Sequence, residues 1–237
     1  MRSFESEKDF LENYNSRDYD APLATVDLCI FSIINQSLKV LVVKRSEYPL
    51  KGRWALPGGI IDIEVDPDLE ATALRKLEFK TGVKTPYVEQ VETVGNRTRD
   101  PRGWSMTVLY LALLDHRHAK TGDAEEVCWV TLPEVNKMDL AFDHLQLINK
   151  AVERLRSKVS YSTLPMHILP IEFTLAELQK AYEIIMGRKV DKKAFRRRIE
   201  TANLLDETGE MRQDGGRPAK LYKIRKNSET HFYNRSI

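Results

Sequence analysis

Two stretches in the first half of the chain decide its fold: WALPGG, residues 54–59, and LRKLEFKTGV, residues 74–83. The first ends in a proline and two glycines, a composition that predicts a loop. The second belongs to a segment with helical periodicity from Asp68 to Thr81, after which Gly82 is expected to end the helix. A glycine loop followed by an amphipathic helix is therefore expected at this point of the chain.

Strand-like segments surround this loop and helix. ATVDLCIFSII and LKVLVVKR flank a turn at residues 35–37 and predict a β-hairpin. Further strands are expected at YVEQVETVG, MTVLYLALL and EVCWVTL, and a long amphipathic helix at residues 138–159. Cys29 and Cys128 lie in apolar, strand-like surroundings, which favours free thiols over a disulfide, a metal site or a nucleophile.

The last third of the chain has a different pattern. The residues TLAE predict a capping box between Thr174 and Glu177, and the helix that starts there is expected to end at Gly187. A second helix is expected from Asp191, followed by two short strands around a glycine turn. Residues 188–226 include 13 basic and 6 acidic residues, which gives this segment a net charge of +7. The whole chain has a net charge of +2, so the rest of the chain carries −5. A basic module is thus joined to a mildly acidic one.

Two helices followed by a basic hairpin are typical of a winged helix-turn-helix. The second helix would lie in the major groove of DNA, and the wing would contact the backbone or a minor groove. A solvated charged face is the alternative, but the basic wing argues against it. RNA usually requires aromatic residues on a sheet, and none is evident. The candidate DNA-binding residues are Lys192, Lys193, Arg196, Arg197, Arg198, Arg217 and Lys220.

The stretches quoted first resemble the Nudix box, G-x5-E-x7-R-E-U-x-E-E-x-G-U, where U is a bulky apolar residue. Gly59, Arg75 and Leu77 match it, as do Gly82 and Val83. Where the family has three helix glutamates, which would hold Mg²⁺ against a pyrophosphate, this chain has Lys76, Phe79 and Lys80, and the loop before Arg75 is two residues longer. The resemblance therefore implies a Nudix-like domain without catalysis and without a metal.

The ligand pocket of that fold is expected to remain. Residues 97–110, RTRDPRGWSMTVLY, are similar to the RDPRG segment of Nudix proteins that accept ADP-ribose-like nucleotides. Arginine suits that role because its planar guanidinium pairs bidentately with phosphate. Trp54 or Trp104 would stack on a base or belong to the core. The candidate ligand-binding residues are Arg45, Trp54, Gly58, Gly59, Arg75, Arg99, Asp100, Arg102 and Tyr110.

Together these features resemble the Nudix-related transcriptional regulators of NAD metabolism, the NrtR family. The resemblance implies an α+β fold, in which a Nudix-like α/β/α sandwich precedes a small winged helix-turn-helix domain. The expected divisions are an N-terminal arm at 1–20, the sensing domain at 21–158, a linker at 159–173, the DNA-binding domain at 174–226 and a tail at 227–237.

The implied protein is a homodimeric repressor of NAD synthesis or salvage genes. It would bind a palindromic double-stranded operator, release it when ADP-ribose or a related metabolite binds, and need no cofactor. The start of the chain is too acidic and polar for a signal peptide, and no run of about 18 apolar residues occurs, so we expect a cytoplasmic protein without a membrane partner.

Two alternatives remain at this point. One is an ADP-ribose pyrophosphatase with a displaced metal site built from the loop acids Asp62, Glu64, Asp66, Asp68 and Glu70. The other is a ligandless scaffold for protein interactions, which would bind no nucleotide. Metal-dependent turnover of ADP-ribose would favour the first, and failure to bind ADP-ribose would favour the second.

Overall fold

The computed structural model describes residues 5–15, 18–84, 87–119, 127–213, 218–225 and 232–233. Its first domain is built on a mixed sheet with the strand order β3-β2-β1-β6-β5, in which β4 also pairs with β1 and β7 with β2. The central strands β1 (Leu23–Ile34) and β6 (Ser105–Leu113) run parallel, and the other pairings are antiparallel. The remaining strands are β2 (Ser37–Lys44), β3 (Trp54–Ala55), β4 (Gly58–Ile60), β5 (Tyr87–Asn96) and β7 (Val127–Thr131).

The expected hairpin and helices are present. Asn35 and Gln36 have positive φ values of 51° and 58°, the conformation that a two-residue hairpin turn requires. Helix α2 (Leu69–Thr81) is capped by Asp68, whose side chain accepts from the backbone N–H of Ala71, and ends at Gly82 with a φ of 67°.

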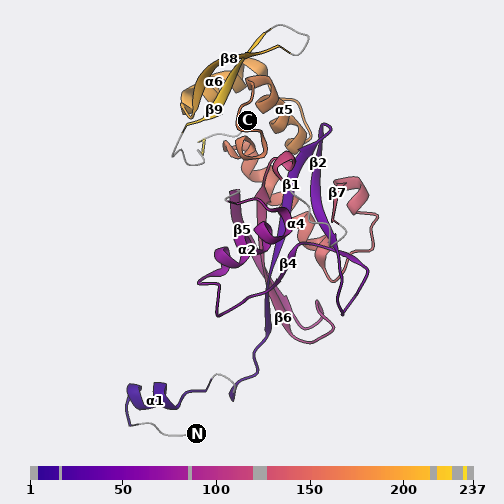
Figure 1. Ribbon diagram of the computed structural model, residues 1–237, viewed down its shortest axis with the longest axis vertical. Helices are drawn as coiled ribbons and strands as arrows, with labels where there is room; N and C mark the ends of the chain where they lie inside the picture. Colours follow the sequence, from indigo (N-terminus) through magenta and orange to yellow (C-terminus); the bar gives the residue numbers. More distant parts are fainter. Residues whose placement is uncertain are drawn as a thin grey trace.

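The two faces of the sheet are covered by different helices. Leu28 and Ile30 of β1 face α2, whereas Cys29 and Phe31 face α4 (His144–Ser160), because successive side chains of a strand point to opposite faces. This alternation produces the expected α/β/α sandwich (Figure 1). Cys29 and Cys128 are free thiols. Two short elements follow strands of the sheet: α3 (Leu132–Val135) comes after β7, and η2 (His116–His118) comes after β6.

The long helix was expected from residue 138 but begins only at His144. Residues 139–143 form an irregular segment in which Phe142 has a φ of 53°, a conformation that a helix excludes. The helical period of the sequence continues into this segment because its apolar residues are buried: Leu140 and Ala141 are 8% and 0% exposed. The expected start at residue 138 was therefore wrong, because apolar residues buried in an irregular segment have the same spacing as those of a helix.

The second domain contains α5 (Leu175–Met186), α6 (Lys192–Ala202) and the hairpin of β8 (Leu205–Arg212) and β9 (Ala219–Ile224). The capping box of Thr174 and Glu177 is confirmed, as are the end of α5 at Gly187 and the start of α6 after Asp191. The glycine turn between the two strands, residues 214–217, lies outside the described residues. This arrangement is a winged helix, and Figure 1 shows it at the opposite end of the molecule from α1 (Glu7–Asn13).

One hydrophobic core runs through both domains. Residues 159–173, expected to be a linker, include η3 (Leu164–Ile168), and its Leu164, Met166 and Ile168 are at most 3% exposed. The same core contains Leu147 of α4 and Tyr182 of α5. The Tyr182 hydroxyl donates to the carbonyl oxygen of Ser162 at 2.6 Å. The winged helix is therefore packed directly against the Nudix-like domain.

Candidate functional site

A cleft of about 420 Å³ opens where the glycine loop meets the C-terminal half of α2. Its lining contains five basic side chains and one acidic side chain, Glu47, a net charge of 5 − 1 = +4. A cleft with this charge suits an anion such as a phosphate. The basic residues are Lys44, Arg45, Lys76, Lys80 and Arg102.

The glycine loop lies close to both β1 and α2. A Cβ at Gly58 would be 2.3 Å from the carbonyl oxygen of Val26, and a Cβ at Gly59 would be 3.0 Å from Nζ of Lys76. Gly59 also has a φ of 146°, which side chains rarely tolerate. Burial lowers the pKa of Lys76, and the nearby Arg75 lowers it further. The two glycines therefore let the loop backbone approach β1 and the side chain of Lys76 closely.

The residues of this cleft do not fit a divalent cation. Lys76 and Lys80 would repel it, and Phe79, which is 78% exposed, has no oxygen ligand. Asp66 in the acidic loop is already engaged by Arg75, with Nε 2.6 Å from Oδ1. That hydrogen bond holds the pKa of Asp66 well below its usual value. Among the described residues, no group of three or more His, Cys, Asp or Glu side chains is placed to hold a metal ion.

The two arginines of the RDPRG segment, Arg99 and Arg102, have different surroundings. Arg102 forms a two-bond pair with Asp100, with Nη2 2.8 Å from Oδ2, and its side chain is 44% exposed at the cleft. Burial raises the pKa of Asp100, but the hydrogen bonds from Arg102 outweigh it and the net shift is downward. Arg99 points inward instead: its side chain is 5% exposed and pairs with Asp143. Asp100 thus orients Arg102, and Arg99 has a structural partner.

The segment before α4 contacts every loop that forms the cleft. The guanidinium of Arg45 lies over the Phe142 ring, 4.8 Å from its centroid. The backbone N–H of Ala141 donates to the carbonyl oxygen of Trp54 at 2.8 Å. The N–H of Leu56 donates to Nδ1 of His144 at 2.8 Å, and burial lowers the pKa of this histidine. The N-terminus of α4 therefore fixes the walls of the cleft.

The expected ligand residues divide into two groups. Arg45, Gly58, Gly59 and Arg102 line the cleft, and Asp100 holds Arg102. The other four do not line it: Trp54 packs against the core, Tyr110 is 5% exposed beneath α2, Arg75 pairs with Asp66 and Arg99 with Asp143. The sequence reasoning missed Lys44, Lys76 and Lys80 as cleft residues. The sequence did indicate the two lysines of α2: Lys76 and Lys80 are one helical turn apart and therefore lie on the same face of the helix.

The second candidate site is the outer face of α6. Phe195 and Ile199 are buried, and Phe195 packs edge to face on Tyr182 with ring centroids 5.3 Å apart. Four basic side chains on the opposite face are exposed, and within the described ranges none of them forms an ion pair. They are Lys192, Lys193, Arg196 and Arg197.

The other three expected DNA-binding residues differ from this group. Nη1 of Arg198 donates to the carbonyl oxygen of Ser160 at 3.4 Å, and its guanidinium lies 4.5 Å from the centroid of the Tyr233 ring. Arg198 is thus directed toward the end of α4. Lys220 on the wing is exposed and pairs with Glu207, with Nζ 2.9 Å from Oε2. Arg217 lies outside the described residues.

The chain matches two family models: a NUDIX domain over residues 24–151 and the NrtR DNA-binding winged helix domain over residues 165–224. Among the described helices, none combines the length and apolar character needed to cross a membrane. The chain is 48% identical, over 94% of its length and 90% of the relative's, to an "ADPR responsive transcriptional repressor NtrR" from Acinetobacter baylyi. It is also 32% identical, over 56% of its length and 74% of the relative's, to an ADP-ribose pyrophosphatase from Methanocaldococcus jannaschii.

Two solved structures of Shewanella oneidensis NrtR are similar to the chain. NrtR in complex with a 27mer DNA has a TM-score of 0.85 and 46% identity, covering 91% of this chain and 99% of that one. The NUDIX domain of NrtR in complex with ADP ribose has a TM-score of 0.56 and 48% identity, covering 63% of this chain and 99% of that one. The two family matches, in this order and with this degree of identity, place the chain in the NrtR family, whose members join a Nudix domain to a DNA-binding winged helix.

Proposed function

We propose that the protein is a transcriptional repressor that binds DNA through its winged helix and releases it when ADP-ribose occupies the Nudix domain. The observation that carries this proposal is the presence, in one continuous fold, of a cationic cleft and an exposed basic helix. Its regulated genes would be those of NAD synthesis or salvage, as the family resemblance implies. The similarity to an ADPR-responsive transcriptional repressor over nearly the whole chain supports the same conclusion.

The cleft suits the diphosphate of ADP-ribose. Arg102 presents a planar guanidinium that Asp100 has already oriented, so that little side-chain entropy is lost when it meets a phosphate oxygen. Lys76 and Arg45 bring further positive charge to the same space. The NUDIX domain of a relative with 48% identity has been solved with ADP ribose, which supports this choice of ligand.

The same residues argue against hydrolysis, the alternative that the similarity to a pyrophosphatase raises. Cleavage of a pyrophosphate by Nudix enzymes uses carboxylates to hold Mg²⁺. Lys76, Phe79 and Lys80 take the place of those carboxylates, and Asp66 is neutralised by Arg75. We therefore assign the cleft to binding without catalysis.

The DNA-binding unit is a dimer in this proposal. One winged helix reaches a single half-site, and specific binding generally requires two recognition helices in major grooves one helical turn, or a multiple of it, apart. A palindromic operator follows from the two-fold symmetry of such a dimer. The contacts on each half-site would come from Lys192, Lys193, Arg196 and Arg197, with the wing lysine Lys220 on the backbone.

Helix α4 connects the two sites. Its N-terminus is bound to the cleft through Asp143 and His144, and its last residue, Ser160, accepts a hydrogen bond from Arg198 of the recognition helix. Seventeen residues of helix span about 25 Å. A ligand that moves the RDPRG segment would therefore move α4 and, with it, the position of α6.

The test is an electrophoretic mobility shift with the genomic DNA upstream of the chain's own gene. The protein should shift this DNA, and ADP-ribose should lower the bound fraction, because it must prefer the DNA-free arrangement in order to act as a signal. An unchanged bound fraction at saturating ADP-ribose would contradict the sensor role. Sedimentation of the free protein and the complex would test the dimer.

A further inference from the structure

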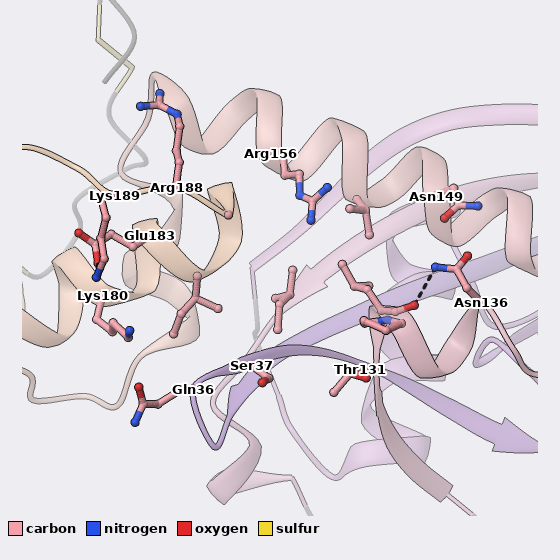
Figure 2. A pocket seen from close by; sticks show the side chains of 16 residues that line it. Gln36, Ser37, Thr131, Asn136, Asn149, Arg156, Lys180, Glu183, Arg188 and Lys189 are labelled. Atoms are coloured by element: carbon pink, nitrogen blue, oxygen red, sulfur yellow. Dashed lines mark hydrogen bonds and ion pairs between the residues drawn. The ribbon is translucent and has the colours of Figure 1, made fainter.

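A second cavity, of about 710 Å³, lies between the two domains (Figure 2). One wall belongs to the Nudix-like domain and consists of the β1–β2 turn, α3 and the side of α4. The other wall belongs to the winged helix and consists of α5 and the turn that leads into α6. This interdomain groove is separate from the cleft, since the two have no lining residue in common.

The groove is positively charged. Its lining includes the basic residues Arg156, Lys180, Arg188 and Lys189 and one acidic residue, Glu183, a net charge of 4 − 1 = +3. Glu183 is already engaged: its carboxylate accepts from Nζ of Lys189 at 3.1 Å and from the backbone N–H of Val190 at 3.2 Å. Glu183 is therefore not available to balance Arg156 and Lys180.

Arg156 and Lys180 face the groove from opposite domains. Figure 2 shows Arg156 extending from α4 into the space between the domains and Lys180 projecting from α5, whereas Arg188 points away. Nε of Arg156 donates to the carbonyl oxygen of Ile185 at 3.2 Å, which fixes the guanidinium across the domain boundary. Within the part of the chain that the structure describes, neither Arg156 nor Lys180 forms an ion pair with an acid.

The remaining lining suits a phosphorylated molecule rather than a bare ion. Gln36, Ser37 and Asn149 add amide and hydroxyl groups, and Leu38, Val152 and Ile184 add apolar surface. The volume is within the range of about 300–1,000 Å³ that small-molecule sites occupy. A phosphate would pair with the guanidinium and the ammonium, and a ring or ribose would lie on the apolar surface.

We propose that the interdomain groove is a second effector site, which binds a phosphorylated metabolite of about mononucleotide size. A ligand held by Arg156 of one domain and Lys180 of the other favours the arrangement in which the two walls have this spacing. By linkage it changes the affinity of the winged helix for DNA. The site depends on neither ADP-ribose nor the cleft.

The probe for this site is inorganic pyrophosphate, titrated into the full chain by calorimetry. All measurements use an Arg102→Ala background, so that binding in the cleft is weakened. Lys180→Ala and Arg156→Ala should each raise the Kd at least about tenfold, since each removes a charge-assisted contact. Lys8→Ala, which removes one exposed charge on α1, is the matched control and should leave the Kd unchanged.

Hydrogen exchange supplies a second readout. Pyrophosphate should slow exchange of the backbone amides at residues 187–189 in the background chain but not in the Lys180→Ala chain. No measurable binding, or equal Kd values for Lys180→Ala and Lys8→Ala, would overturn the proposal. It would also be overturned if Lys180→Ala weakened only DNA binding, because the groove would then belong to the DNA contact surface. Unchanged release of DNA by ADP-ribose in Lys180→Ala would show that the two sites are independent.

Discussion

Arg99 and Asp143 form a buried two-bond ion pair, in which Nε and Nη2 of the arginine each lie 3.0 Å from one carboxylate oxygen. The two side chains are 5% and 12% exposed, and Asp27 lies 3.6 Å from the same guanidinium. The pair joins the RDPRG segment to the residue that precedes α4. It connects the wall of the cleft to the helix that reaches the winged helix.

Removing Arg99 should therefore destabilise the protein. Arg99→Ala removes the arginine that both Asp143 and Asp27 contact, and breaking a buried pair typically costs about 3–5 kcal/mol. Urea denaturation measures the loss directly. Arg97→Ala, an exposed arginine two residues earlier, is the control and should change the free energy of unfolding by less than about 0.5 kcal/mol. Equal stabilities would mean that the Arg99–Asp143 pair contributes nothing to the fold.

Binding of ADP-ribose should depend on Arg102. Arg102→Ala removes a charge-assisted contact with phosphate, and the Kd measured by calorimetry should rise roughly ten- to a hundredfold. Arg117→Ala is a closely matched control, because Arg117 pairs with Asp115 two residues before it at the same 2.8 Å but lies outside the cleft. A Kd unchanged by Arg102→Ala but raised by Arg117→Ala would place the ligand elsewhere.

The stability of the protein should fall in mild acid because of His144. Burial lowers its pKa in the folded state, so below about pH 6.5 the unfolded chain binds a proton that the folded chain does not. The contribution is fully present above that pH and is lost as the pH falls toward the folded pKa, by at most about 1.4 kcal/mol per pH unit. In His144→Gln the amide oxygen replaces Nδ1 as acceptor for Leu56. The difference in unfolding free energy between pH 7 and pH 5 should be smaller in this variant, and an equal difference would contradict the assignment.

The salt dependence of DNA binding should identify the residues of α6 that meet phosphate. Each phosphate contact contributes about 0.9 to the slope of log K against log salt. Arg196→Ala should lower the slope by about one if it meets a phosphate, or relax the sequence preference if it reads a base edge. Arg198→Ala should leave the slope unchanged, because its guanidinium is directed toward Ser160 and Tyr233. Lys137→Ala, an exposed lysine in the other domain, controls for net charge.

Incubation with ADP-ribose and Mg²⁺ or Mn²⁺ should release no AMP. The positions where carboxylates would bind the metal hold Lys76, Phe79 and Lys80, and two of these side chains repel a cation. Chromatography of the reaction mixture measures the product. Turnover near ~1 s⁻¹, at the lower end of usual enzyme rates, would restore the pyrophosphatase hypothesis.

The sequence predicted the structure best at helix ends, where interactions between residues close together in the chain decide the conformation. Asp68, Thr174 and Asp191 start helices because their side chains accept from nearby backbone amides, and Gly82 and Gly187 end them with positive φ values. These signals depend on neighbours within four residues, so no tertiary contact is needed to read them.

It was less informative where partners are distant along the chain. Arg99 meets Asp143 across 44 residues, and Arg198 meets Ser160 across 38. Nothing in either local sequence separates an arginine that binds a ligand from one that pairs inside the fold. For the same reason, the packed segment before Phe173 was expected to be a linker, since its two prolines suggest a loop but its burial comes from both domains.

Lys76, whose Nζ lies beside Gly59, stands where Nudix enzymes have a metal-binding glutamate, so the proposed sensor would bind ADP-ribose without cleaving it. This affects how quickly DNA binding can follow the concentration of ADP-ribose. A receptor that leaves its ligand intact is filled according to concentration and Kd alone, and it returns each molecule that it samples. It neither depletes the metabolite nor needs a further reaction to reset. Such a detector follows a falling level of ADP-ribose as readily as a rising one, and the delay in its answer is set by the dissociation rate of the ligand.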